Sequence, residues 1–154
     1  MSKLGLYNQL KTTLSAISGI KHVSLWNNQY TNEAQENAFL YPCVFIQFTD
    51  ENFRDTTKGV QQYDSIITLH IGFESYKDTD TDILTLKQTI YAAVHTLQVG
   101  TDNSKLLRVG ERQNFDHSNV QDYEMDFKTT IKDADAAITH ITQIADLNLT
   151  VIKA

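Results

Sequence analysis

The sequence contains a single cysteine, Cys43, together with one proline and six glycines in 154 residues. One cysteine excludes an internal disulfide framework and any metal site built from several cysteines. So little proline and glycine excludes a linker protein rich in these residues. No apolar stretch approaches the roughly 20 residues that span a bilayer, and the first residues form no signal-peptide core. We therefore expect a soluble protein made in a reducing cytoplasm, with Cys43 as a small buried hydrophobic side chain.

Basic residues are also few. Lysine and arginine total 13 against 19 aspartates and glutamates, which gives a net charge of −6. This charge argues against a nucleic-acid-binding module with a basic face, because neutralising phosphates requires clustered lysine and arginine. The remaining composition, with 41% hydrophobic and 21% charged residues, is ordinary for a globular chain. The length suits one domain that buries its own core.

Two segments show the three- and four-residue spacing of apolar side chains that is typical of amphipathic helices. The first covers residues 3–18, and the second covers roughly residues 82–98. Thr79 or Thr81 can cap the second helix, whose dipole favours the aspartates of Asp78–Asp82. The expected apolar faces are Leu4, Tyr7, Leu10, Leu14 and Ile17 in the first helix, and Ile83, Leu86, Ile90, Val94 and Leu97 in the second.

Alternating or continuous apolar residues predict strands over residues 22–25, 43–49, 61–75, 105–115 and 120–132. The polar residues 50–59 are expected to form a long loop, and loops of this length are often functional. Phe53, which precedes Arg54 in this loop, is either an anchor for a protein contact or a local plug. The element order α-β-β-β-α-β-β predicts an α+β fold, with a largely antiparallel sheet and two helices packed on one face.

Acidic side chains gather on one face of the expected strand over residues 120–132. Asp122, Glu124 and Asp126, which we call the acidic row, alternate with apolar residues. Alternate residues of a strand lie about 7 Å apart, so the row could form a catalytic carboxylate set. We favour the interpretation that it is a solvated face. The basic side chains expected to neutralise it in part are Arg108, Arg112, Lys128 and Lys132.

Charge also predicts the register of the last two strands, which we expect to form a hairpin. A loop with an odd number of residues would place Val109 opposite Met125 or Phe127. The same loop would bring Arg108 and Arg112 across from the acidic row. Apolar pairs across a sheet are favourable and like charges directly opposite are unfavourable, so we predict the odd loop.

Residues 26–41 are rich in asparagine and glutamine, with aromatic residues interleaved. Amphipathic aromatics beside amide side chains suit a contact surface, which would make Trp26 and Tyr30 candidates for contact with another subunit. The alternative, which we favour, is a surface loop whose aromatic side chains pack into the core.

The C-terminal residues differ from the rest, and we divide the chain into a single α+β domain over residues 1–132 and an extended arm over residues 133–154. The arm is rich in β-branched residues, which favour extended structure. A fully exposed strand would be an aggregation hazard, so the arm pairs within the domain or adds to a neighbouring subunit's sheet. Its candidate contact residues are Ile138, Ile141, Ile144, Leu147, Leu149 and Val151.

Asp78, Asp80 and Asp82 resemble the first ligands of a calcium-binding loop. That loop requires glycine at its sixth position and glutamate at its twelfth, where this chain has Ile83 and Thr89. We therefore favour helix capping as their role over cation binding.

The histidines are scattered over different expected elements, and none shows the paired spacing of a zinc-binding helix. His70 and His95 are expected to be core or edge residues. The sequence has neither a glycine-rich phosphate loop nor a Gly-x-Ser-x-Gly nucleophile elbow. We expect no enzyme, no catalytic residues, no resident metal and no cofactor.

A set of hydrophobic patterns covers roughly residues 3–132. They are the start Leu4, Tyr7, Asn8 and Leu10 through Gly19 and Ile20, the strand Tyr41–Phe48, the strand end His70–Phe73, and the helix Ile83–Leu97. This arrangement resembles the tail-terminator and tail-completion (neck) proteins of tailed bacteriophages. The residues from Asp133 onward depart from the pattern of that family.

The resemblance implies a structural virion protein that is assembled in the host cytoplasm. Such proteins form homo-oligomeric rings, often hexamers, that cap the tail tube and join it to the head-side connector. DNA passes through the ring only in transit, and no membrane is involved. The loop over residues 50–59 and the segment 26–41 would then contact neighbouring rings, and the arm would add to an adjacent subunit's sheet.

Two other functions stay open on the sequence. One is a non-viral, monomeric α+β module that binds a ligand or a protein, for which a concave apolar pocket between sheet and helices would be expected. The other is a metal-dependent hydrolase that uses the aspartates of Asp78–Asp82 or the acidic row.

Overall fold

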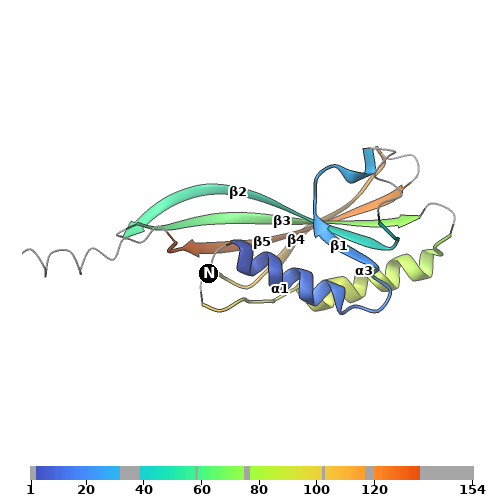
Figure 1. Ribbon diagram of the computed structural model, residues 1–154, viewed down its shortest axis with the longest axis horizontal. Helices are drawn as coiled ribbons and strands as arrows, with labels where there is room; N and C mark the ends of the chain where they lie inside the picture. The colour runs from blue at the N-terminus through green and yellow to red at the C-terminus, as the bar shows by residue number, and fades with distance from the viewer. Residues whose placement is uncertain are drawn as a thin grey trace, which may run out of the picture.

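The computed structural model describes residues 3–31, 39–57, 59–74, 77–101, 103–116 and 120–135 (Figure 1). The fold is α+β, as predicted. Residues 136–154 lie outside the described residues, and with them all the candidate contact residues of the arm. The elements in chain order are α1 (Lys3–Ser15), β1 (His22–Leu25), the 3-10 turn η1 (Gln29–Thr31), β2 (Cys43–Thr57), β3 (Val60–Glu74), α3 (Asp80–Val94), β4 (Leu107–Asn114) and β5 (Val120–Asp133).

The strands form one sheet in the order β1-β2-β3-β5-β4. β1 pairs with β2 in parallel, and the other three pairings are antiparallel. Both helices lie on the same side of the sheet, below it in Figure 1, which confirms the predicted packing. None of the described helices is long and apolar enough to cross a membrane.

The main hydrophobic core lies between the helices and this face of the sheet. α1 contributes Leu6, Leu10 and Leu14 to it, and α3 contributes Ile83, Ile90 and Val94. The first helix differs from the prediction, because it ends at Ser15 and turns Leu4 outward while burying Leu6. The strand residues that complete this core include Val44, Ile46, Ile67, Leu69, Ile71, Phe73, Met125, Phe127 and Ile131.

The predicted loop over residues 50–59 is wrong. β2 continues to Thr57 and β3 begins at Val60, with Asp50 paired to Ser65 and Asp55 to Gln61. Strand pairing uses backbone groups, so a sequence with polar side chains on both faces can continue a strand where both faces meet water. The ends of β2, β3 and β5 extend past the helices and give the molecule an elongated shape (Figure 1).

The register of the β4–β5 hairpin was predicted in part. The loop of residues 115–119 has an odd number of residues, and Arg112 lies opposite Glu124. The placement of Val109 and Arg108 was wrong, because a bulge between Arg108 and Gly110 shifts the register. Arg108 consequently pairs with Phe127, and Val109 is 58% exposed.

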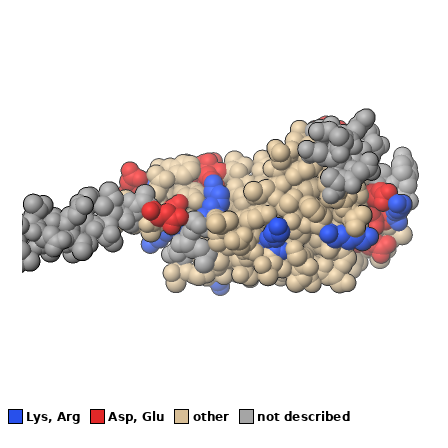
Figure 2. All heavy atoms as spheres, in the orientation of Figure 1, with Lys and Arg blue, Asp and Glu red and all other residues tan. Residues whose placement is uncertain are grey.

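Charged side chains are unevenly distributed over the surface seen in Figure 2. On that face, acidic side chains gather towards the two ends of the elongated molecule, and its middle carries few charges. One end is formed by the parts of β2, β3 and β5 that extend past the helices, which we call the strand extension. At its base, Lys3 of α1 forms an ion pair with Asp50 of β2. The ion pair ties the start of the first helix to the base of this extension.

Candidate functional site

The sheet face that points away from the helices carries most of the buried polar side chains. Strand register places the alternate residues of β2, β3 and β5 on this face in rows. The first row is Cys43, Gly72 and Asp122, the second is Phe45, His70 and Glu124, and the third is Gln47, Thr68 and Asp126.

A second, smaller hydrophobic cluster covers one end of this face. Its buried aromatic members are Tyr30, Phe39 and Phe45, and Trp26 and Tyr41 pack against it. The ring of Phe45 lies 4.9 Å from that of Phe39 and 5.4 Å from that of Tyr30. Tyr30 is only 3% exposed. For Tyr30 this favours the alternative in which the aromatics of this segment pack inward, whereas Trp26 keeps part of its surface in solvent.

Next to these aromatic rings lies a group of buried ionisable side chains, His70, Asp122 and Glu124, which we call the His70 cluster. The Nδ1 atom of His70 lies 3.5 Å from Oδ2 of Asp122 and 3.7 Å from Oε1 of Glu124. The three residues are between 0% and 6% exposed. Within the part of the chain that the structure describes, this is the one group of three residues able to share a metal ion.

Two neighbours fix the imidazole of His70. Its Nε2 atom donates a hydrogen bond of 2.8 Å to Oε1 of Gln47. An amide oxygen can only accept hydrogen bonds, so the imidazole is the donor. The indole of Trp26 stacks on the ring with centroids 4.0 Å apart and an interplanar angle of 10°. Trp26 is itself held by the hydrogen bond from its backbone N–H to the carbonyl of Ile46. The ring orientation is therefore set by β2 and by the segment after β1.

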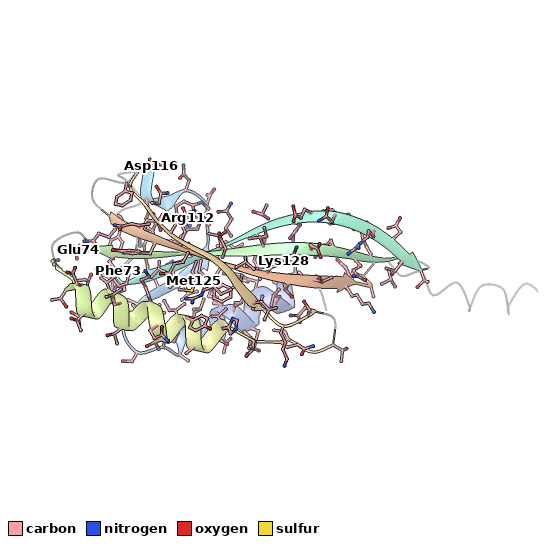
Figure 3. The ribbon with its side chains drawn as sticks, turned by 180° about the vertical axis from the view of Figure 1, so that it is seen from behind. Phe73, Glu74, Arg112, Asp116, Met125 and Lys128 are labelled. Carbon is pink, nitrogen blue, oxygen red and sulfur yellow. The ribbon has the colours of Figure 1, made fainter. Side chains whose placement is uncertain are left out.

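Arg112 of β4 neutralises part of this face. Its guanidinium pairs with Glu124 and Asp126, and Asn114 donates a hydrogen bond of 3.2 Å to Oε1 of Glu124. Partial burial lowers the pKa of Arg112, but hydrogen bonds and charges from Asp126 and Glu124 outweigh this and raise it. In Figure 3, Arg112 lies on the side of the sheet away from the helices, and Met125 lies on the helix side.

The interpretation of the acidic row as a solvated face was wrong for two of its three members. Asp122 and Glu124 are buried, and only Asp126 is partly exposed. Of the basic residues expected to neutralise the row, Arg112 does so, whereas Lys128 pairs with Asp64 and Arg108 with Glu111. The physical reason is that the aromatic cluster and the side chains of Arg112 and Asn114 pack against the start of β5, which alternation along a single strand does not reveal.

Sequence reasoning did not connect His70, Gln47 and Trp26 with the acidic row. Alternation along β3 places His70 and Thr68 on the same face, and this much could be read from the sequence. The β3–β5 register, which sets His70 opposite Glu124, joins residues that are far apart in the chain. The position of Trp26 over the imidazole depends on how the segment after β1 returns across the sheet.

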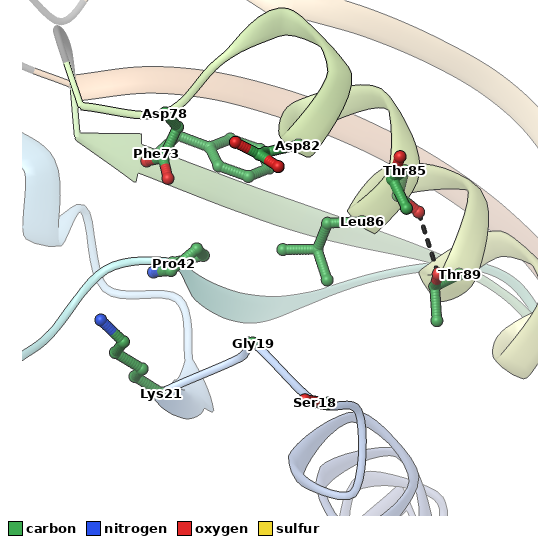
Figure 4. Close-up of a pocket in the computed structure, with 10 residues that line it drawn as sticks. All are labelled: Ser18, Gly19, Lys21, Pro42, Phe73, Asp78, Asp82, Thr85, Leu86 and Thr89. Atoms are coloured by element: carbon green, nitrogen blue, oxygen red, sulfur yellow. Dashed lines mark hydrogen bonds between the residues drawn. The ribbon is translucent and has the colours of Figure 1, made fainter.

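The aspartates of Asp78–Asp82 lie at the start of α3, in a different part of the molecule. Thr79 caps this helix, since its hydroxyl accepts from the N–H of Asp82 and donates to the Asp82 carboxylate. The predicted capping role is thereby confirmed for Thr79. Asp78 and Asp82 line a surface pocket of about 340 Å³, shown in Figure 4, together with Lys21 and Leu86. Among the described residues, the aspartates do not form a three-ligand group.

Phe53 and Arg54 lie on the strand extension rather than in a loop. The ring of Phe53 stacks on Tyr63 with centroids 4.8 Å apart, while 54% of Phe53 stays exposed. Phe53 can therefore act as a local plug, because its side chain covers Tyr63, and also as an anchor for a protein contact, because it presents apolar surface. Arg54 is exposed beside it.

Cys43 is fully buried, in agreement with its predicted role as a small hydrophobic side chain. Burial raises the pKa of its thiol to about 12. We expect the native protein to resist thiol-specific reagents in mildly alkaline buffer and to react only as it unfolds in urea, because the thiolate is the reactive form. Rapid labelling of the native protein would contradict this.

The raised pKa of Cys43 also predicts a pH dependence of stability. The thiol ionises near its ordinary value of 9.0 in the unfolded chain and near 12 in the folded chain. Between these values the unfolded state binds fewer protons, so the free energy of unfolding falls as pH rises. Urea unfolding across this interval measures the effect, and Cys43→Ala should reduce the slope.

Comparison with known proteins adds no assignment. No protein-family model matches the chain, and no curated protein matches it significantly. The function is therefore argued from the fold and from the geometry described above.

Proposed function

We propose that this chain is a structural subunit of a homo-oligomeric ring in the neck of a tailed bacteriophage. In this role it terminates the tail tube, joins it to the head-side connector and lets DNA pass through the ring. The element order and the two helices on one face of the sheet agree with the resemblance noted in the sequence. The observation that carries the proposal is the open edge of the long strand β2.

The edge of β2 is covered over only a short part of its length. β1 pairs with Cys43–Ile46, and beyond Ile46 no described strand lies on the outer side of β2. Such an edge presents unpaired backbone N–H and C=O groups, which can accept another strand. Charged side chains, among them Glu51, Arg54 and Asp55, are exposed along it and keep the free subunit from pairing indiscriminately.

A ring requires a heterologous contact, in which one surface of a subunit meets a different surface of the next. An open edge that receives a strand from a neighbour is a contact of this type. We propose that the segment Ile138–Val151, which lies outside the described residues, supplies that strand. Its β-branched residues, and the alternation of apolar and polar residues over 147–151, suit strand addition.

The net charge of −6 is compatible with DNA transit. A lumen wall of negative charge repels phosphates, so DNA would slide through the ring without being gripped. A binding role at the same place would require clustered lysine and arginine instead.

The proposal is tested by the mass of the untagged full chain in native mass spectrometry and by its shape in negative-stain electron microscopy. We expect a closed ring of several copies with a central opening, and caps at one end of added tail tubes. Removing residues 138–154 should give folded monomers. A strict monomer at high concentration that also fails to join tail tubes or connectors would contradict the proposal.

Phe53 offers a finer test of where the subunits meet. Phe53→Ala should weaken the ring without unfolding the subunit, because the side chain is half exposed on the extension. Leu84→Ala is the matched control, since Leu84 is similarly exposed at 63% on the outer side of α3. If both substitutions changed the mass distribution equally, Phe53 would not lie in the contact between subunits.

A further inference from the structure

We propose that the His70 cluster binds one divalent transition-metal ion through Nδ1 of His70, Oδ2 of Asp122 and Oε1 of Glu124. These three atoms lie within 4.8 Å of one another. The three ligands lie on β3 and β5 and not on β2, and the inference does not depend on the proposed ring.

The spacing of the donor atoms fits a bound ion. An ion with bonds of about 2.0–2.2 Å to nitrogen and oxygen separates neighbouring donors by roughly 3–4 Å. The imidazole nitrogen lies 3.5 Å and 3.7 Å from the two carboxylate oxygens, within this range. Two of the three donor pairs therefore already have the spacing of a bound ion, and the two carboxylate oxygens lie within 4.8 Å of each other.

The hydrogen bond to Gln47 determines which nitrogen of His70 is available. Because Oε1 of Gln47 can only accept, Nε2 carries the proton and the lone pair of a neutral imidazole lies on Nδ1. That lone pair faces two carboxylate oxygens, an arrangement that is repulsive without a cation between them. A histidine whose second nitrogen donates to an oxygen is the usual state of a metal ligand.

The carboxylate of Glu124 is also oriented by its neighbours. Arg112 pairs with Oε2 of Glu124, which leaves Oε1 directed towards His70 and Asn114. Trp26 stacks on the imidazole and covers one of its faces. Gly72 lies opposite Asp122 on the neighbouring strand, and the hydroxyl of Tyr30 lies against this glycine.

The donor set defines the class of ion. One imidazole suits zinc, iron, nickel and copper, and two carboxylates extend this range to manganese. Three protein ligands leave a further position for water in a tetrahedral zinc site. The ion would join β3 to β5 at the end of the sheet that the aromatic cluster covers, and so stabilise this end of the fold.

The competing occupant of this position is a proton. His70 protonated on both nitrogens would be an imidazolium ion held between two carboxylates, with no room for a metal. This arrangement predicts that the purified chain neither contains nor takes up metal at neutral pH, so metal binding separates the two possibilities.

The experiment uses the untagged full chain, freed of metal with a chelator and titrated with zinc, manganese or cobalt chloride. We expect one ion per chain for at least one of these metals by calorimetry, and visible absorption from bound Co²⁺. No binding of any of the three metals by the wild-type chain would overturn the proposal in favour of the imidazolium ion.

Variants assign the binding to this cluster. His70→Gln should abolish it, and His95→Gln, the same change at a histidine outside the cluster, should leave it unchanged. Circular dichroism establishes that each variant is folded. Unchanged binding in folded His70→Gln, or equal loss in His95→Gln, would overturn the assignment.

Gln47→Leu provides a second test that leaves all three ligands in place. Loss of such a supporting hydrogen bond typically costs about 10–100-fold in metal affinity. We therefore expect weaker binding at the same stoichiometry, with the fold retained because Gln47 is only partly buried. An unchanged affinity in this variant would contradict the argument from the tautomer of His70.

Discussion

Phe45→Ala is expected to lower the free energy of unfolding by about 3–5 kcal/mol, the usual cost of truncating a buried phenylalanine. Phe45 is fully buried on β2, in the part of that strand that pairs with both β1 and β3. Its ring contacts the rings of Trp26, Tyr30 and Phe39, so the substitution leaves a cavity at the centre of the second hydrophobic cluster. The main core is a separate cluster on the helix side of the sheet, so its side chains do not fill this cavity.

Urea unfolding followed by tryptophan fluorescence measures this effect, because Trp26 is the sole tryptophan and packs against the same cluster. Phe53→Ala is the matched control, since it removes the same atoms as Phe45→Ala but from a side chain that is 54% exposed. Its stacking on Tyr63 is worth about 0.5–1.5 kcal/mol. Similar losses in both variants would show that the second cluster does not behave as core.

Gly72→Ala is expected to destabilise the fold by about 1–3 kcal/mol or more through overpacking. A Cβ atom at this position would clash with the hydroxyl of Tyr30 and would lie 2.9 Å from Sγ of Cys43. Both neighbours are buried, so neither can move aside without disturbing the aromatic cluster. Glycine is therefore required here by close packing and not by a special backbone conformation.

Gly110→Ala is the control for this prediction. A Cβ atom there would lie 3.1 Å from a carboxylate oxygen of Asp126, on the edge strand β4, where a small shift relieves the contact. We expect a change within about 1 kcal/mol, because alanine also restricts the unfolded chain. Thermal or urea unfolding of both variants makes the comparison, and equal losses would contradict the packing argument.

Most elements could be predicted from the sequence because their signals are local. The spacing of Leu10 and Leu14, or of Ile83, Ile90 and Val94, is a property of one segment and indicates a helix wherever that segment packs. The alternation along β5 likewise indicated which side chains share a face. The extension of β2 beyond Thr49 was missed because its polar residues carry no such signal, and its strand pairing comes from the backbone of β3.

The candidate site was predicted only in fragments. Asp122 and Glu124 stood out as acidic residues of one strand face, and His70 as a histidine on another strand. Their meeting follows from the pairing of β3 with β5, since His70 and Asp122 are 52 positions apart. Pairing partners at this distance are selected by the register of whole strands, which no short pattern specifies.

The sequence by itself determined the α+β class, the two amphipathic helices, the odd loop of the last hairpin and the burial of Cys43. These features could be predicted because periodicity, loop length and the apolar sequence neighbours of Cys43 are local properties of the chain. The tertiary structure decided that Asp122 and Glu124 of the acidic row are buried and that both face the imidazole of His70. Burial depends on what packs against a strand, and here the contacts come from the side chains of Arg112 and Asn114 on β4 and from the segment around Trp26.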